Sequence, residues 1–117
     1  MINVVFNENK LIINETRKII FKRNIKKTIL DEDRVYVLLE IPWIKVDEET
    51  EDDYSNVYCY DKDGKRIWQI EKREKPPETF FIGMFLIENE LSVTDFIGLN
   101  CTLDKSNGKI INTEVVK

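Results

Sequence analysis

The chain of 117 residues contains no histidine at all. This absence excludes the usual zinc ligand sets, the Ser-His and Cys-His nucleophile pairs, and the side chain most used for proton transfer near neutral pH. The carboxylates, lysines and tyrosines that remain show no spacing that converges on a reaction centre. We therefore expect a protein that is not an enzyme, with no catalytic residue, no metal and no cofactor.

Glycine, proline and cysteine are scarce. Only seven residues are glycine or proline and 42% are apolar, a composition that excludes a disordered chain and predicts a single domain over residues 1–117. Cys59 and Cys101 are expected to be reduced core residues, because no export signal accompanies them. No apolar run reaches membrane-spanning length and the first residues do not form a signal peptide, so we expect a cytoplasmic protein that does not bind membranes.

Period-two alternation of β-branched and aromatic residues dominates the chain. It predicts an all-β or β-dominated domain of about eight strands, arranged as meandering antiparallel hairpins in a curved sheet, a sandwich or a partial barrel. Residues 34–41 and 80–87 are apolar on both faces, which is typical of central strands covered on both sides. We expect these two segments to form most of the core, with a bulge or a close backbone approach at Gly83.

Residues 24–30 are ambiguous. Phe21, Ile25 and Ile29 lie four residues apart and could share one face of a helix. The Ile and Thr content of the segment and the lack of a glycine stop favour a strand or a short loop, and the helix is kept as an alternative.

Two polar turns of similar composition interrupt strand patterns. The stretch NVYCYDKDGKRIWQI, residues 56–70, turns at Asp61-Lys62-Asp63-Gly64. The stretch LDKSNGKI, residues 103–110, has a similar aspartate-to-glycine turn with one more residue. In both, the aspartate is expected to accept hydrogen bonds from backbone amides, and Gly64 or Gly108 to supply a positive φ. A calcium loop of the EF-hand type needs oxygen ligands over twelve residues, so these turns are interpreted as structural.

The 56–70 stretch resembles the strand-turn-strand of β-propeller blades of the quinoprotein type. With RVYVLLE upstream, residues 34–40, the chain is also similar to small bacterial proteins that carry a blade-like sheet as a single domain. One or two such units cannot close a propeller. The cofactor ligands of the propeller enzymes have no matching positions here, so this resemblance implies no function.

Charge is unevenly distributed along the chain. Residues 1–30 hold seven Lys and Arg against two Glu, residues 31–64 hold three against twelve acidic residues, and the remainder balances. The centre of the acidic block is residues 47–53, with six carboxylates in seven residues, which we expect to be a solvated loop. In general character, a small acidic histidine-free β-protein resembles the immunity proteins that neutralise bacterial toxins.

The hypothesis from these observations is an inhibitor that binds a basic, nuclease-type toxin domain through the acidic loop. Complementary charge would speed the encounter, while flanking aromatic residues would anchor the complex. The predicted partner-binding residues are Trp43, Asp47, Glu48, Glu49, Glu51, Asp52, Asp53 and Tyr54. Tyr36 is a further candidate anchor.

Two alternatives remain. The acidic loop could serve only solubility in a blade-like scaffold or binding module. The basic strip over residues 17–27, namely Arg17, Lys18, Lys22, Arg23, Lys26 and Lys27, could bind nucleic acid, although the pI near 5.0 and the lack of a stacking platform oppose it. No small-molecule ligand is expected.

Overall fold

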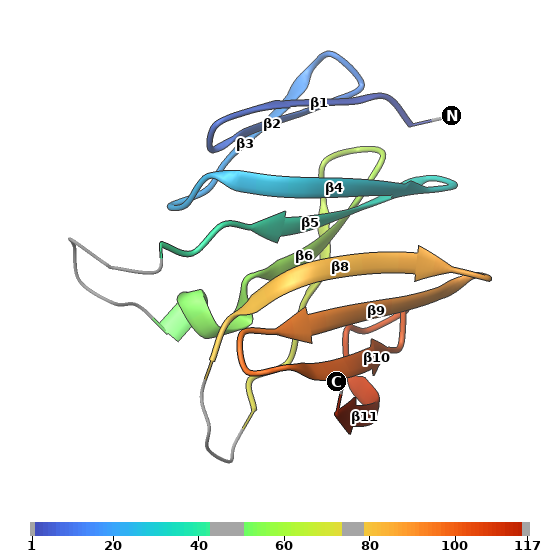
Figure 1. Ribbon diagram of the computed structural model, residues 1–117. Helices are drawn as coiled ribbons and strands as arrows, with labels where there is room; N and C mark the ends of the chain where they lie inside the picture. The colour runs from blue at the N-terminus through green and yellow to red at the C-terminus, as the bar shows by residue number, and fades with distance from the viewer. Residues whose placement is uncertain (1, 43–50, 74–78, 116–117) are drawn as a thin grey trace.

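Eleven β-strands form three separate antiparallel sheets in the computed structural model, which describes residues 2–42, 51–73 and 79–115 (Figure 1). The first sheet contains β1 (Val4–Asn7), β2 (Lys10–Ile13) and β3 (Arg17–Ile20). The middle sheet contains β4 (Ile25–Asp31), β5 (Arg34–Leu39), β6 (Val57–Asp61) and β7 (Arg66–Gln69). The third contains β8 (Phe81–Ile87), β9 (Glu90–Asp95), β10 (Leu99–Leu103) and β11 (Ile110–Val115).

Each sheet is a meander in which every strand pairs with its neighbour in sequence. The predicted all-β fold of antiparallel hairpins is confirmed, and the sheets do not close into a barrel. The strands outnumber the eight or so predicted. One strand that the prediction lacked is β9, in which buried Leu91, Val93 and Asp95 alternate with Ser92 and Thr94.

The middle sheet is covered on both faces. Toward the first sheet it buries Val35, Val37 and Leu39 of β5, and toward the third sheet it buries Tyr36 and Leu38. In Figure 1 the first sheet lies above the middle sheet and the third lies below it. The prediction of a two-sided apolar strand over 34–41 is therefore confirmed by β5, which β4 and β6 flank within the sheet.

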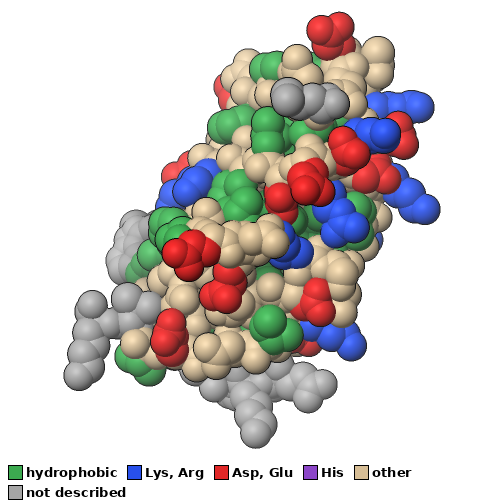
Figure 2. Space-filling view, turned by 90° about the vertical axis from the view of Figure 1, so that its right-hand side faces the viewer, with side chains coloured by type: hydrophobic (Ala, Val, Ile, Leu, Met, Phe, Trp, Pro, Cys, Tyr) green, Lys and Arg blue, Asp and Glu red, His purple; other side chains and the backbone are tan. Residues whose placement is uncertain are grey.

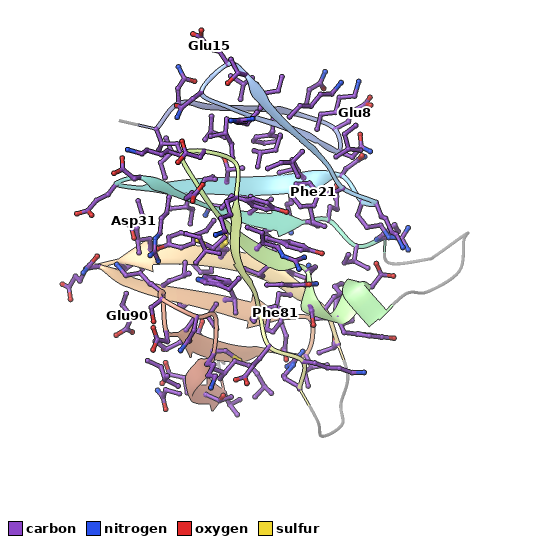
Figure 3. The ribbon with its side chains drawn as sticks, turned by 180° about the vertical axis from the view of Figure 1, so that it is seen from behind. Glu8, Glu15, Phe21, Asp31, Phe81 and Glu90 are labelled. Carbon is purple, nitrogen blue, oxygen red and sulfur yellow. The ribbon has the colours of Figure 1, made fainter. Side chains whose placement is uncertain are left out.

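Two apolar clusters join the three layers. Phe21 belongs to the cluster between the first and middle sheets, and Phe81 to the cluster between the middle and third sheets (Figure 3). The first cluster also includes an aromatic group, in which the Phe21 ring centroid lies 5.2 Å from that of Tyr58 and 5.9 Å from that of Tyr60. Aromatic pairs at these separations add to the free energy gained from burial alone.

The prediction of a central strand over 80–87 is wrong. This segment forms β8, which lies at the edge of the third sheet and pairs only with β9. Phe81 and Met84 are buried, but Phe85 and Ile87 of its other face are exposed. The expected bulge at Gly83 is present, because the register shifts between Phe81 and Gly83.

The ambiguous 24–30 segment is a strand, β4, and the helical alternative is wrong. The four-residue spacing of Ile25 and Ile29 suggested a shared face, but the register of β4 with β5 shifts between Ile25 and Lys27. A regular strand would place Ile25 and Ile29 on one face, whereas the bulge directs Ile25 toward the first sheet and Ile29 toward the third. The 3-10 helix η1 (Glu51–Ser55) precedes β6, and in the described ranges no helix is long and apolar enough to cross a membrane.

Cys59 and Cys101 are free and buried in the cluster between the middle and third sheets, as predicted. Burial raises the pKa of the Cys59 thiol to about 12 and also raises the pKa of Cys101. We expect the folded protein to resist Ellman's reagent at pH 8, because the raised pKa lowers the fraction of Cys59 present as thiolate about 1,000-fold. Both thiols are expected to react once urea unfolds the chain. A Ser106→Cys variant at an exposed turn provides the reactive control, and rapid labelling of native Cys59 would contradict the prediction.

Candidate functional site

Asp53, the last carboxylate of the predicted acidic segment, is buried rather than solvated. It belongs to η1 and is 2% exposed. Its oxygens accept hydrogen bonds from Arg23, with Nε 3.0 Å from Oδ1 and Nη2 3.0 Å from Oδ2. This bidentate geometry is the strong form of a carboxylate-guanidinium pair. The expectation that Asp53 is offered to a partner is therefore corrected, since its carboxylate joins η1 to the basic strip.

The other predicted partner-binding residues are distributed as follows along the chain. Glu51 and Asp52 are the first residues of η1, and Tyr54, in the same helix, is half-buried. The predictions for Trp43, Asp47, Glu48 and Glu49 fall outside the described residues.

Tyr36, the further candidate anchor, is a core residue. It is completely buried between the middle and third sheets, and its ring is stacked on Trp68 with centroids 6.0 Å apart. Its hydroxyl donates a hydrogen bond to Oδ2 of Asp31 at 2.7 Å. A side chain held in this way cannot reach a partner, so the interpretation of Tyr36 as an anchor is wrong.

Asn56 is a buried polar residue that the sequence did not single out. Its Nδ2 donates to the carbonyl oxygens of Leu39 and Phe81, each at 2.8 Å, and its Oδ1 accepts from the Phe81 amide at 2.9 Å. The side chain thus imitates a strand partner for Phe81 and joins the middle sheet to the third. Together with the Arg23–Asp53 pair, it fixes the backbone at the end of the acidic segment.

Three cations of the predicted basic strip have partners within the protein. Arg23 binds Asp53, Lys26 Nζ donates to the Ile82 carbonyl at 2.7 Å, and Lys27 Nζ donates to the Met84 carbonyl at 2.8 Å. The Lys27 ammonium also lies 4.9 Å from the centroid of the Phe85 ring. The strip is divided between two sheets, with Arg17 and Lys18 in β3 and the two later lysines in β4.

The turn at Asp61 to Gly64 is structural, as predicted. Oδ1 of Asp61 accepts from the amides of Asp63 and Lys65, both at 2.9 Å, and Gly64 has φ +81°. In the second turn, Oδ1 of Asp104 accepts from the Ser106 amide at 2.9 Å, and Gly108 has φ +76°. In both turns the aspartate accepts hydrogen bonds from backbone amides of the same turn.

A third turn of this kind was not predicted. Oδ1 of Asp95, which is completely buried, accepts from the amides of Ile97 and Leu99, and Gly98 has φ +99°. Oδ2 of the same carboxylate pairs with Arg73 Nη1 at 2.7 Å. The signal was present in the sequence, because Asp95 and Gly98 have the same spacing as Asp61 and Gly64.

Five turns gather at one end of the molecule, which we call the hairpin end: residues 14–16, 31–34, 61–65, 88–90 and 104–109. Figure 2 faces this end, where acidic side chains are spread among lysines and arginines, and Figure 3 shows Glu15, Asp31 and Glu90 there and Glu8 at the opposite end. Asn14 Nδ2 donates to the Lys62 carbonyl at 2.9 Å, which ties the first sheet to the middle sheet. Glu15, Glu32 and Glu88, all exposed, have φ of +67°, +55° and +50°.

An ion-pair network ties the middle sheet to the third at the hairpin end. Lys105 Nζ lies 3.2 Å from Asp31 Oδ2, and Arg34 Nη1 donates to the Lys105 carbonyl at 3.0 Å. The hydrogen bond from Tyr36 and the nearby Lys105 lower the pKa of Asp31, while burial and Asp31 raise the pKa of Tyr36. These groups line an open depression of about 400 Å³ together with Glu32, Asp33 and Asn89. Within it, Asp31, Arg34 and Lys105 have partners inside the protein.

Metal ligands do not gather in the part of the chain that the structure describes, where no three His, Cys, Asp or Glu side chains come together as a metal site. Buried polar side-chain atoms in the same ranges all have hydrogen-bond partners.

Comparison with known protein families shows a match to the family described as Domain of unknown function (DUF7957), over residues 1–115. The chain belongs to the DUF7957 family. Because the match extends from before β1 to the end of β11, the DUF7957 domain is the whole three-sheet stack rather than a single blade-like hairpin. No curated protein matches the chain.

Proposed function

We propose that this DUF7957 protein is a non-catalytic inhibitor that binds a basic protein domain, as an immunity protein binds a nuclease-type toxin. The observation that carries the proposal is the acidic segment, residues 47–53, with its last carboxylate fixed on Arg23. Nucleases hold phosphates with lysine and arginine, and carboxylates can occupy the same donors. A dense row of carboxylates is therefore suited to block such a cleft.

The Arg23–Asp53 pair supports this proposal physically. It uses one of the six carboxylates, and the five others in residues 47–52 precede a backbone fixed by Asp53 and Asn56. A segment fixed at one end loses less conformational entropy on binding than a free tail of the same composition. Trp43 and Tyr54 flank the segment and are the aromatic residues from which we expect much of the affinity.

The internal partners of the basic strip favour a protein over a nucleic acid as the ligand. Arg23, Lys26 and Lys27 would have to leave Asp53 and the β8 carbonyls before they could bind phosphates. Breaking a bidentate pair with a buried carboxylate is costly, because the carboxylate is left without its counter-charge.

The test begins with affinity capture of a partner from the source organism, followed by growth rescue with any toxin found. Reversing three charges in the segment, Asp47→Lys, Glu49→Lys and Asp52→Lys, is expected to slow association at least about tenfold at low salt and little at high salt. The matched control reverses three glutamates of the hairpin end, Glu15→Lys, Glu32→Lys and Glu88→Lys. It changes the net charge equally, and we expect association close to that of the wild type.

Four outcomes would contradict the proposal. An unchanged association rate in the segment variant at low salt would remove the electrostatic mechanism. Slower association in the control alone would place the partner at the hairpin end instead. A captured protein without toxicity, or a toxin whose effect on growth persists, would remove the immunity function.

A further inference from the structure

A cleft of about 210 Å³ opens between the first and middle sheets, beside the end of β3. In the described ranges, the apolar cluster between these two sheets includes Tyr58 and Tyr60 of β6 but no residue of β7. Arg66 of β7 lies opposite Tyr60, so the two side chains share one face of the middle sheet, and both line the cleft. The cleft therefore lies at the margin where the first sheet stops covering the middle sheet.

Three aromatic side chains line the buried part of the cleft. Tyr58 and Tyr60 are stacked with ring centroids 6.4 Å apart, and the ring of Phe21, which Figure 3 labels, contacts both of them. Ile20, at the end of β3, also lines the cleft and is 61% exposed. Together these side chains can bind a planar apolar group through burial and ring contacts.

The charge of the cleft is positive. Lys22, Arg23 and Arg66 line it together with a single carboxylate, that of Asp53, which leaves a net charge of +2. Arg23 is held by Asp53 in the bidentate pair. Lys22 and Arg66 are exposed and have no ion-pair partner in the part of the chain that the structure describes. Two cations are therefore available to an anion that enters the cleft.

The hydroxyl of Tyr60 adds a hydrogen-bond donor without charge. It makes no hydrogen bond to any described residue, whereas the Tyr58 hydroxyl accepts one from Gln69 Nε2 at 3.1 Å. Since every buried polar side-chain atom of the described ranges has a partner, the Tyr60 hydroxyl is in contact with the open space of the cleft. Burial raises the pKa of the Tyr60 phenol, and nearby Arg66 offsets part of this rise. The hydroxyl thus keeps its proton at neutral pH and can donate it to an acceptor.

We propose that this cleft binds a small aromatic anion, namely a single ring that carries a carboxylate or a phosphate. The ring packs against Phe21 and the two tyrosines, and the anionic group binds Lys22 and Arg66. The volume of about 210 Å³ is below the roughly 300–1,000 Å³ of sites for drug-sized ligands, which favours one ring over a whole nucleotide. No small-molecule ligand was expected from the sequence, because these residues lie in well-separated segments. The site does not depend on the proposed inhibitor function.

The test is a titration of the ¹⁵N-labelled 117-residue chain with phenyl phosphate, followed by the amide resonances. We expect a dissociation constant on the order of 1 mM, as suits a ligand of this size, and shifts at the amides of residues 20–23 and 66. Inorganic phosphate lacks the ring and benzylamine carries the opposite charge, so each is expected to bind at least about tenfold more weakly. No binding of phenyl phosphate up to about 10 mM, tenfold above the expected constant, would overturn the proposal. So would inorganic phosphate that binds equally well.

Variants of the lining residues place the anion within the cleft. The double variant Lys22→Gln and Arg66→Gln is expected to weaken phenyl phosphate binding at least about tenfold, and Tyr60→Phe about threefold. The matched control, Lys18→Gln with Lys62→Gln, removes the same charge from exposed residues outside the cleft and should bind like the wild type. Equal affinities of the two double variants would overturn the assignment of the site.

Two further probes distinguish a free small molecule from a macromolecule. A phosphotyrosine peptide offers the same ring and phosphate on a side chain, and a short single-stranded oligonucleotide offers bases and phosphates. Either is expected to bind no more than a few times tighter than phenyl phosphate, because the cleft holds one ring. Binding more than about tenfold tighter would overturn the proposal and assign the cleft to that macromolecule instead.

Discussion

An Asn56→Ala variant is expected to lose about 3–5 kcal/mol of its free energy of unfolding, because three hydrogen bonds disappear and their partners stay buried. The side chain is fully buried and serves the carbonyls of Leu39 and Phe81 and the amide of Phe81. Alanine cannot satisfy any of them, and the joint between the middle and third sheets is weakened. Urea unfolding followed by tryptophan fluorescence measures the loss.

Asn100→Ala is the matched control for this prediction. Asn100 is half-buried in β10, and its Oδ1 accepts one hydrogen bond, from the Thr94 hydroxyl at 3.2 Å. Its replacement is expected to cost about 1 kcal/mol or less. A loss in Asn56→Ala no larger than that in Asn100→Ala would show that the joint between the sheets does not depend on Asn56.

A Gly108→Ala variant is expected to lose about 3 kcal/mol or more, enough to lower the melting temperature by about 10 °C. Two effects combine at this position. Gly108 has φ +76°, and an added Cβ would lie 2.5 Å from Cε3 of Trp68. The indole cannot move aside, because it is 5% exposed, stacked on Tyr36 and bonded through Nε1 to the Lys105 carbonyl at 2.8 Å. Thermal unfolding by circular dichroism measures the change.

Gly83→Ala is a control in which both effects are weak. At Gly83 the new Cβ would meet the far edge of the Phe85 ring at 3.1 Å, and that ring is 43% exposed and can turn away. Gly83 is not among the glycines of positive φ. We expect a change of less than about 1 kcal/mol, as for other partly exposed positions. Equal losses in the two variants would mean that the positive φ and the contact with Trp68 are not the cause.

The sequence predicted those features that depend on neighbouring residues. The two-sided pattern of residues 34–41 predicted the buried strand β5, and the aspartate-glycine spacing predicted the turns at Asp61 and Asp104. The turns follow from local backbone geometry. The buried strand follows from the number of its covered faces, which the alternation of apolar and polar residues reports directly.

Features that depend on distant segments were not predictable in the same way. The apolar pattern of β8 is as strong as that of β5, yet β8 lies at the edge of its sheet and one of its faces is exposed. Both properties depend on how the strands and sheets are arranged, which the pattern of a single segment does not report. In the candidate site, six clustered carboxylates look alike in the sequence. Only the fold brings Asp53, and not a neighbour, to Arg23, thirty residues earlier in the chain. The buried role of Asn56 likewise depends on Phe81, twenty-five residues later.

In the described ranges every ladder connects strands that follow one another along the chain, and the strands of each sheet are consecutive in sequence. Backbone pairing therefore requires mostly short loop closures, for which the entropy cost is small, and β5 and β6 are joined by the longer connection 40–56. The long-range part of folding is the docking of layers through side chains, with one apolar cluster on each side of the middle sheet. An outer layer can consequently diverge in sequence during evolution while the opposite cluster remains intact.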